Sequence, residues 1–190
     1  MKDRPHFWNW VSQTPGDVME IGVHKGSSFA RMVEIAHRLG FKAYAVDSFE
    51  GMAEPGERDE GHYPAGKFDV GGLSGFTAVF LELMKRHNLP EGSWVAHQGW
   101  VPDVLSDFPD EQRFGFIRID LDHYQPTLDA ARWAVRHLLP EGILSFHDWF
   151  PDRTTLAAGA INEFILEQAA PPRSFVRTEG MELSLWGLGH

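Results

Sequence analysis

Short apolar runs alternate with longer amphipathic segments along most of this 190-residue chain. A helix is the usual connection between two parallel strands, so this alternation predicts an α/β fold with a doubly wound, Rossmann-like, mostly parallel sheet and helices on both faces. The apolar runs, which we expect to be strands, are 18–23, 43–47, 94–98, 116–120 and 143–147. The segments with helical spacing are 27–39, 76–85, 127–138 and 155–168.

Two further segments complete the predicted fold. The tail SFVRTEGMELSLWGL indicates two strands around Glu179 and Gly180, a hairpin that adds an antiparallel edge to the sheet. Residues 51–75 are rich in glycine, proline and charge and have no period, so we expect a long loop that acts as a lid, with a partly disordered segment as the alternative. We expect residues 1–190 to form one domain, with a short N-terminal segment at 1–14. We expect the lid, or a partner subunit of a homo-oligomer, to cover the binding site of this domain.

Composition excludes several classes of partner. The net charge is −10 and no run of five or more lysines or arginines occurs, which disfavours nucleic acid and anionic membrane surfaces. The chain has no cysteine, hence no disulfide and no thiolate zinc site. No apolar stretch approaches the ~18 residues of a membrane span, and the start of the chain lacks a signal-peptide core. We therefore expect a cytoplasmic protein whose partner is a small molecule.

The stretch VMEIGVHKGSS is the first motif with chemical content. Glu20, Gly22, Gly26 and Ser28 fall where an apolar strand gives way to a helix. Glycines there let the backbone approach a ligand, and the helix offers its free amides. The spacing E-x-G-x-x-x-G differs from the G-x-G-x-x-G of dinucleotide-binding proteins, which disfavours a nicotinamide or flavin enzyme. Tight packing of the turn is the alternative explanation for the glycines.

Asp47 closes the second predicted strand, 21 residues after Gly26. In doubly wound folds an acid at this place meets the ribose hydroxyls of a bound nucleoside. We therefore predict that Asp47 binds a ribose, with a solvated loop aspartate as the alternative.

Six motifs occur in order between Pro15 and Trp149: PGDVMEIGVHKGSS, AVDSFEGM, GKF, HQGWVPDVL, IRIDLDHYQPTLDA and LPEGILSFHDW. Together they resemble class I S-adenosylmethionine-dependent methyltransferases, most closely the macrocin O-methyltransferase family. The resemblance implies a bound S-adenosylmethionine, with the loop from Glu20 to Gly26 beside the methionine and Asp47 on the ribose. It also implies an adenosine side formed by Ser48, Phe49, Gln98, Gly99 and Trp100. Core packing is the alternative for the two aromatic rings.

A second group of polar residues follows two other strands. Asp120 ends one predicted strand and His147 and Asp148 end the next, so the three should meet at the carboxyl edge of the sheet. Two carboxylates and an imidazole suit magnesium or another small divalent ion. The resemblance also implies a metal here, but the family usually has two adjacent acids where this chain has His147 and Asp148. Imidazole is a softer ligand than a carboxylate, so manganese, iron or zinc competes better with magnesium for this site. The alternative is that His147 does not ligate a metal at all. Helix capping is the alternative for Asp120 and Asp122.

These motifs predict a metal-assisted O-methyltransferase acting on a hydroxyl of a small molecule, such as a sugar or phenol of a secondary metabolite. Asp120 and His123 are the candidate catalytic residues, His123 as the general base because its reference pKa is near neutral; a surface histidine without a role is the alternative. His24 and His62 are weaker candidates, and we expect both to be solvated loop residues. A regulatory protein that binds the nucleoside without turnover is the second hypothesis, favoured by His147 in place of an acid.

Overall fold

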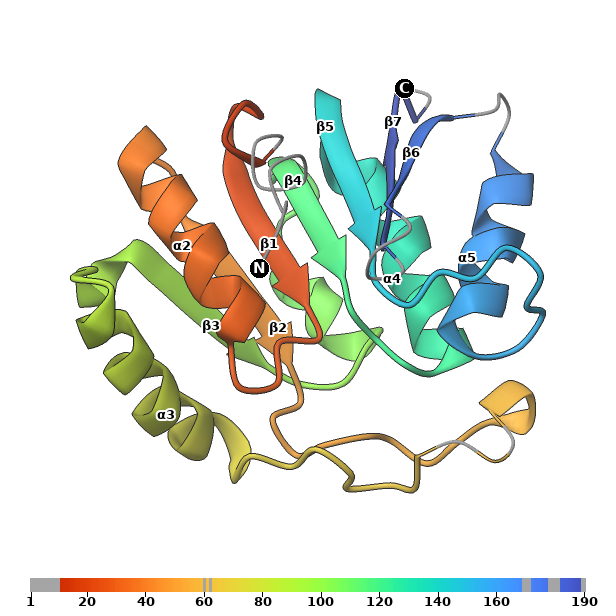
Figure 1. The fold of residues 1–190 in the computed structure, drawn as a ribbon, viewed down its shortest axis with the longest axis horizontal. Helices are drawn as coiled ribbons and strands as arrows, with labels where there is room; N and C mark the ends of the chain where they lie inside the picture. The colour runs from red at the N-terminus through yellow and green to blue at the C-terminus, as the bar shows by residue number, and fades with distance from the viewer. Residues whose placement is uncertain (1–10, 60, 62, 169–171, 178–181, 189–190) are drawn as a thin grey trace.

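The computed structural model describes residues 11–188 apart from 60, 62, 169–171 and 178–181 (Figure 1). Seven strands form one sheet in the order β3-β2-β1-β4-β5-β7-β6. The strands are β1 (Asp17–Ile21), β2 (Ala43–Asp47), β3 (Trp94–Gln98), β4 (Phe114–Ile119), β5 (Leu138–Phe146), β6 (Arg173–Arg177) and β7 (Glu182–Trp186). The helices are α2 (Ser27–Leu39), α3 (Gly72–Arg86), α4 (Tyr124–His137) and α5 (Leu156–Glu167), with 3-10 turns at Glu57–Asp59, Glu91–Ser93 and Asp103–Asp107.

The topology confirms the predicted fold class. Strands β3, β2, β1, β4 and β5 are parallel, whereas β7 pairs antiparallel with both β5 and β6. The strand order reverses between β1 and β4. The chain places β2 and β3 on one side of β1 and then adds β4 and β5 on the other side. In open α/β sheets ligands bind at such a switch point, outside the carboxyl ends of the strands.

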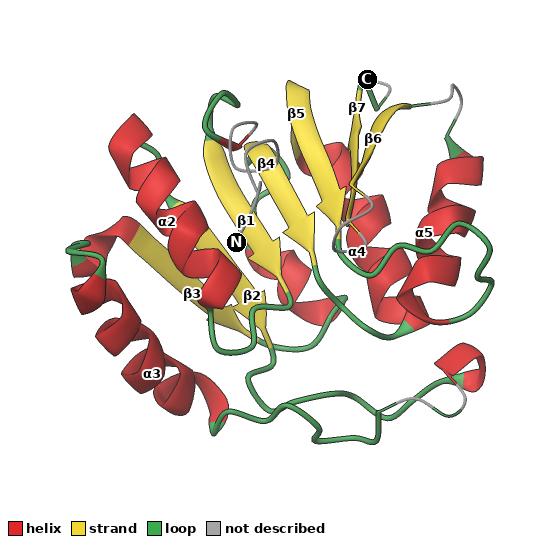
Figure 2. Ribbon diagram, in the orientation of Figure 1, coloured by secondary structure: helices red, strands yellow, loops and turns green. Residues whose placement is uncertain are grey.

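Helices cover both faces of the sheet (Figure 2). Val18 and Phe116 pack with buried residues of α2 and α3 on one face. Met19 and Ile117, one position further along the same strands, pack with α4 and α5 on the other. Because helices cover both faces, β1 and β4 are buried along almost their whole length instead of on alternate residues.

Several predicted boundaries were wrong. Helix α3 begins at Gly72, not at 76, so the long loop ends at Gly71 and contains a 3-10 turn at Glu57–Asp59. Strand β5 begins at Leu138, directly after α4, although Pro140 and Gly142 resemble a turn in the sequence. In both cases tertiary packing overrides the weak local preference of glycine or proline.

The predicted C-terminal hairpin is confirmed as the antiparallel pair β6 and β7. Its turn, around Glu179 and Gly180, lies outside the described residues. None of the helices in the described part of the chain combines the length and apolar character that a bilayer crossing requires.

Candidate active site

A cavity of about 420 Å³ opens at the carboxyl ends of the central strands. The turn after β1 contributes one wall, the residues after β2 and β3 a second, and the segment between β4 and α4 a third. The loop after β2, which crosses below this edge of the sheet in Figure 1, contributes Met52, Tyr63 and Phe68. Of the predicted site residues, Gly22, Ser28, Asp47, Ser48, Gly99, Trp100, Asp120 and His123 line this cavity.

The glycines of the first motif are required by their protein neighbours. Gly22 has φ +85°, and a Cβ built on it would lie 2.2 Å from the carbonyl oxygen of Asp120. Gly26 has φ +82° and would place a Cβ 2.4 Å from the ring of Phe80 in α3. Gly26 is also the N-cap of α2, so the first amides of this helix have no side-chain cap and face the turn. Such amides bind carboxylates and phosphates.

Asp47 organises the turn after β1. Its Oδ2 accepts hydrogen bonds from the backbone N–H groups of Val23 at 2.7 Å and His24 at 2.8 Å. Its Oδ1 accepts the N–H of Phe49 at 2.8 Å. The Ser48 hydroxyl also lies 3.5 Å from Oδ1, but its single proton has a shorter contact with the Gly51 carbonyl, at 2.9 Å. Because two carboxylate oxygens have about four acceptor positions, the side chain can accept one further hydroxyl donor while it lines the cavity.

The residues expected against the adenosine divide into two groups. Ser48, Gly99 and Trp100 line the cavity, and Trp100 is 40% exposed there. Phe49 instead turns its ring into the core, where it is 1% exposed and stacks on Phe76 with ring centroids 4.3 Å apart. The ring therefore takes the core-packing alternative. Gln98 donates to the Ser48 carbonyl at 3.0 Å and so supports the cavity wall from behind.

Glu20 is fully buried behind the cavity. Its Oε1 accepts the Ser28 hydroxyl at 2.7 Å and pairs with Arg118. Burial raises the pKa of Glu20 to about 7, against the opposing charge of Arg118. Arg118 lies on β4 among apolar residues, and we did not single it out from the sequence. Its ion pair with Glu20 becomes apparent only when β4 pairs with β1.

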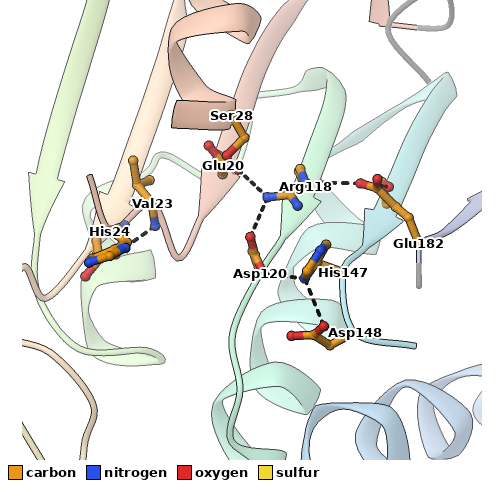
Figure 3. Close-up of polar contacts among 11 residues, drawn as sticks. Glu20, Val23, His24, Ser28, Arg118, Asp120, His147, Asp148 and Glu182 are labelled. Atoms are coloured by element: carbon orange, nitrogen blue, oxygen red, sulfur yellow. Dashed lines mark hydrogen bonds and ion pairs between the residues drawn. The ribbon is translucent and has the colours of Figure 1, made fainter. Parts of the chain in front are cut away.

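Asp120, His147 and Asp148 come together as predicted (Figure 3). The Nδ1 atom of His147 lies 3.0 Å from Oδ1 of Asp120 and 3.1 Å from Oδ1 of Asp148. This Nδ1 is buried, and neither contact has hydrogen-bond geometry. One donor atom from each residue falls within 4.8 Å of the others, a set of two oxygens and one nitrogen that fits a small divalent cation.

Charge in this group is strongly coupled. The Asp120 carboxylate, followed by that of Asp148, raises the pKa of His147 to about 10. Burial opposes ionisation of Asp120, yet His147 and then Arg118 lower its pKa to about 2. The two carboxylates therefore favour the protonated imidazole of His147, and a cation that binds through Nδ1 must compete with its proton.

Two histidines face the cavity. His123 is the N-cap residue of α4, is 3% exposed and lines the cavity beside Asp122. His24, which we expected to be a solvated loop residue, also lines the cavity, with its ring 5.4 Å from that of Phe68. Burial, followed by the charge of Lys25, lowers the pKa of His24, so its ring is neutral at pH 7. His62 lies outside the described residues.

Three residues that lie two or three positions after the end of a strand have left-handed backbone conformations: His24 at φ 50°, Phe49 at φ 56° and Asp148 at φ 59°. Non-glycine residues adopt this region at a cost of roughly 1–3 kcal/mol, and such strain concentrates at functional sites. Here each one redirects a side chain at the carboxyl edge of the sheet: His24 into the cavity, Phe49 into the core and Asp148 toward His147.

The long loop is fixed to the start of α4. Asp59, 2% exposed, accepts the backbone N–H of Tyr124 at 2.8 Å and that of Gly56 at 3.0 Å. Arg58 lies over the Tyr124 ring at 4.3 Å and pairs with Glu163 of α5 at 3.0 Å. Asp59 of the loop thus caps α4, the helix that follows His123. This contact connects the loop, which lines the cavity, to the segment that carries Asp120.

Comparison with known proteins shows the family of the chain. The profile of a methyltransferase domain family matches residues 19–149. The chain belongs to this methyltransferase family. It is 33% identical over 145 residues to 8-demethyl-8-(2,3-dimethoxy-alpha-L-rhamnosyl)-tetracenomycin-C 4'-O-methyltransferase of Streptomyces olivaceus. That match covers 73% of this chain and 54% of the relative, so the chain spans about half the length of this curated relative.

Solved structures show the same fold at lower identity. The O-methyltransferase NovP has a TM-score of 0.73 at 17% identity, over 94% of this chain and 76% of NovP. The calicheamicin methyltransferase CalS11 has a TM-score of 0.73 at 21% identity, over 94% of this chain and 75% of CalS11. TomG from Streptomyces achromogenes, solved with S-adenosylmethionine, has a TM-score of 0.63 at 14% identity, over 98% of this chain and 81% of TomG.

Proposed function

We propose that the chain transfers the methyl group of S-adenosylmethionine to a hydroxyl oxygen of a small molecule. One observation carries this proposal. In a chain of the methyltransferase family, the Gly22 turn and Asp47 share a single cavity with Asp120 and His123. The candidate cofactor-binding groups and the candidate acceptor-side groups therefore line one space, as direct transfer requires.

In this proposal one side of the cavity binds the cofactor and the other side binds the acceptor. The Gly22 turn and the first amides of α2 bind the methionine carboxylate, and Asp47 accepts the ribose hydroxyls. S-Adenosylmethionine supplies a methyl group on a positively charged sulfur. As the new C–O bond forms and the C–S bond breaks, the acceptor oxygen must lose its proton. His123 is our first candidate to take that proton at an imidazole nitrogen and neutral His24 the second, while Tyr63 and Phe68 of the loop exclude water.

Asp120, His147 and Asp148 would hold a divalent cation, most simply magnesium or manganese. A cation there would supply positive charge beside the acceptor oxygen and favour loss of its proton. Asp120 belongs to this group and also lines the cavity, so a cation held by the group would lie beside the cavity.

The acceptor we propose is a sugar or phenol hydroxyl of a secondary metabolite. The tetracenomycin relative is a 4'-O-methyltransferase of a rhamnosyl compound, as its name states, which favours a sugar. The rings of Tyr63, Phe68 and Trp100 at the cavity provide apolar surface for the flat face of a sugar or an aromatic ring.

Methyl transfer from labelled S-adenosylmethionine to a panel of rhamnosylated glycosides and catechols tests this function. The purified chain is assayed with excess chelator, with magnesium and with manganese. We expect turnover that chelation abolishes and metal restores, with binding of S-adenosylhomocysteine unchanged. Asp120→Asn should behave like the chelated enzyme and His147→Asp should keep or raise magnesium-dependent turnover, whereas Asp129→Asn on the exposed face of α4 is the matched control.

The outcomes separate the hypotheses. Full activity of metal-free protein in chelator rejects the cation and keeps methyl transfer. Tight binding of S-adenosylhomocysteine without turnover on any acceptor supports the second candidate, a regulatory protein that binds the cofactor. That candidate is favoured by the His147 imidazolium, which places a positive charge between the two carboxylates where a cation would bind.

A further inference from the structure

A buried arginine connects the two sides of the candidate site (Figure 3). Arg118 is 5% exposed and pairs with three carboxylates. Its Nη1 donates to Oε1 of Glu20 and, at 2.7 Å, to Oδ2 of Asp120. Its Nε donates to Oε1 of Glu182 at 3.1 Å. The guanidinium therefore touches the first motif, a candidate metal ligand and the strand β7.

The sheet geometry puts these groups on one face. Glu20 and Arg118 are register partners on β1 and β4, and Ser145 of β5 is the next residue in the same row. Asp120 follows Arg118 by two positions, so its side chain points to the same side. Ser145 donates to Glu182 at 3.3 Å and closes the network from β5.

The two oxygens of Asp120 face different partners. Oδ2 is held by Arg118, while Oδ1 lies 3.0 Å from Nδ1 of His147. A carboxylate that is free to rotate about its Cβ–Cγ bond can turn its plane away from either partner. The bond from Arg118 fixes that plane, so that the second oxygen points toward Nδ1 of His147.

We propose that Arg118 is a positioning residue for the metal group, and that it holds the Asp120 carboxylate in the orientation that binds a divalent cation. This inference rests on the proposed function, since it concerns the proposed cation. Partners that hydrogen-bond to a metal-ligating carboxylate typically change metal affinity by about 10–100-fold when removed. The same guanidinium, through Glu20 and Ser28, anchors Asp120 to the first turn of α2.

Arg118→Lys is the informative substitution. It keeps a positive charge next to Glu20 and Glu182, so it avoids leaving buried carboxylates without a partner. A lysine ammonium lacks the planar fork that lets arginine reach several carboxylates in fixed directions, so it should fail to orient Asp120. Arg132→Lys is the matched control, because Arg132 also pairs with two carboxylates, Glu163 and Glu167, but on the exposed surface of α4.

The experiment measures Mn²⁺ binding by electron paramagnetic resonance, without cofactor or acceptor, in wild type, Arg118→Lys, Arg132→Lys and Asp120→Asn. We expect Arg118→Lys to bind Mn²⁺ about 10–100-fold more weakly, while its affinity for S-adenosylhomocysteine stays within about threefold of wild type. Arg132→Lys should match wild type. Raising Mn²⁺ should restore turnover in Arg118→Lys, which a general loss of folding would not allow.

Two results overturn the inference and are distinguishable. If Arg118→Lys binds Mn²⁺ like wild type while Asp120→Asn does not, Arg118 has no positioning role and the proposed cation survives. If Asp120→Asn also binds Mn²⁺ like wild type, both the inference and the proposed cation are wrong. Should Arg118→Lys not fold, the combined variant Glu20→Gln, Arg118→Met, Glu182→Gln removes the buried charges together and is compared by Mn²⁺ binding alone, because Glu20 belongs to the predicted cofactor loop.

Discussion

Replacing Asp47 by asparagine should weaken both the cofactor site and the fold. The carboxylate accepts three backbone N–H groups, from Val23, His24 and Phe49, at 2.7 to 2.8 Å. An asparagine amide has one carbonyl oxygen, so it can accept two of these donors at most, and its NH₂ group must face the remaining N–H. Hydrogen bonds to a charged acceptor contribute about 1.5–3 kcal/mol, against about 0.5–1.5 kcal/mol for neutral ones. Over three bonds beside a solvent-accessible cavity, we expect the free energy of unfolding to fall by about 2–3 kcal/mol.

The same substitution should lower affinity for S-adenosylhomocysteine by at least about tenfold, which corresponds to ~1.4 kcal/mol. The loss arises because a ribose hydroxyl would no longer donate to a charged acceptor. Affinity is measured by isothermal titration calorimetry, well below the unfolding midpoint of the variant, and stability by urea unfolding. Asp17→Asn is the control, because Asp17 also accepts a backbone N–H, that of Lys42, at 2.9 Å but at the start of β1.

The two halves of this reasoning can fail separately. Unchanged affinity in a folded Asp47→Asn protein would reject the ribose role. Unchanged urea unfolding would show that the three amide contacts add little to stability.

Three further predictions follow from the site. Gly22→Ala should destabilise the protein by more than about 2 kcal/mol, because the added Cβ would lie 2.2 Å from the Asp120 carbonyl oxygen. Gly40→Ala is the control and should cost about 1 kcal/mol, because Gly40 also has a positive φ but has open space around it. Equal losses of the two variants in urea unfolding would contradict the argument. The pKa of His147 is raised from 6.5 to about 10 in the folded state, so its stabilising contribution is full below pH 6.5 and is lost as the pH rises toward 10. In chelator, the unfolding free energy of wild type should therefore fall over this interval relative to that of His147→Gln, and a constant difference between the two proteins would show that the imidazolium does not stabilise the fold. Asp59→Ala should remove the cap of α4, because Asp59 accepts the Tyr124 N–H, and should lower the free energy of unfolding by about 1 kcal/mol. It should also speed proteolysis within residues 51–71. Asp69→Ala is the control: it loses only a local bond to Gly71 and should be cut more slowly than Asp59→Ala.

Much of the fold was predictable because its signals are local. The bounds of β2, β3 and α2 agree with the predicted segments 43–47, 94–98 and 27–39. The meeting of Asp120 with His147 and Asp148 was predictable too, since each follows a parallel strand and these strands end at one edge of the sheet. Apolar periodicity and the position of a polar residue at a strand end can both be read without knowing which strands pair.

Side-chain direction and strand register, in contrast, were decided by the tertiary structure. The left-handed backbone at Phe49 turns its ring onto Phe76 in the core, away from the cavity where we had expected it. Arg118 is an isolated charge in an apolar strand of the sequence, and its meaning appears only when β4 pairs with β1 and brings it to Glu20, 98 residues away. The sequence by itself determined which segments become strands and helices and which polar groups stand at strand ends. Only the folded sheet determined which of those groups touch, because pairing between distant strands depends on the packing of the whole core and not on any local pattern.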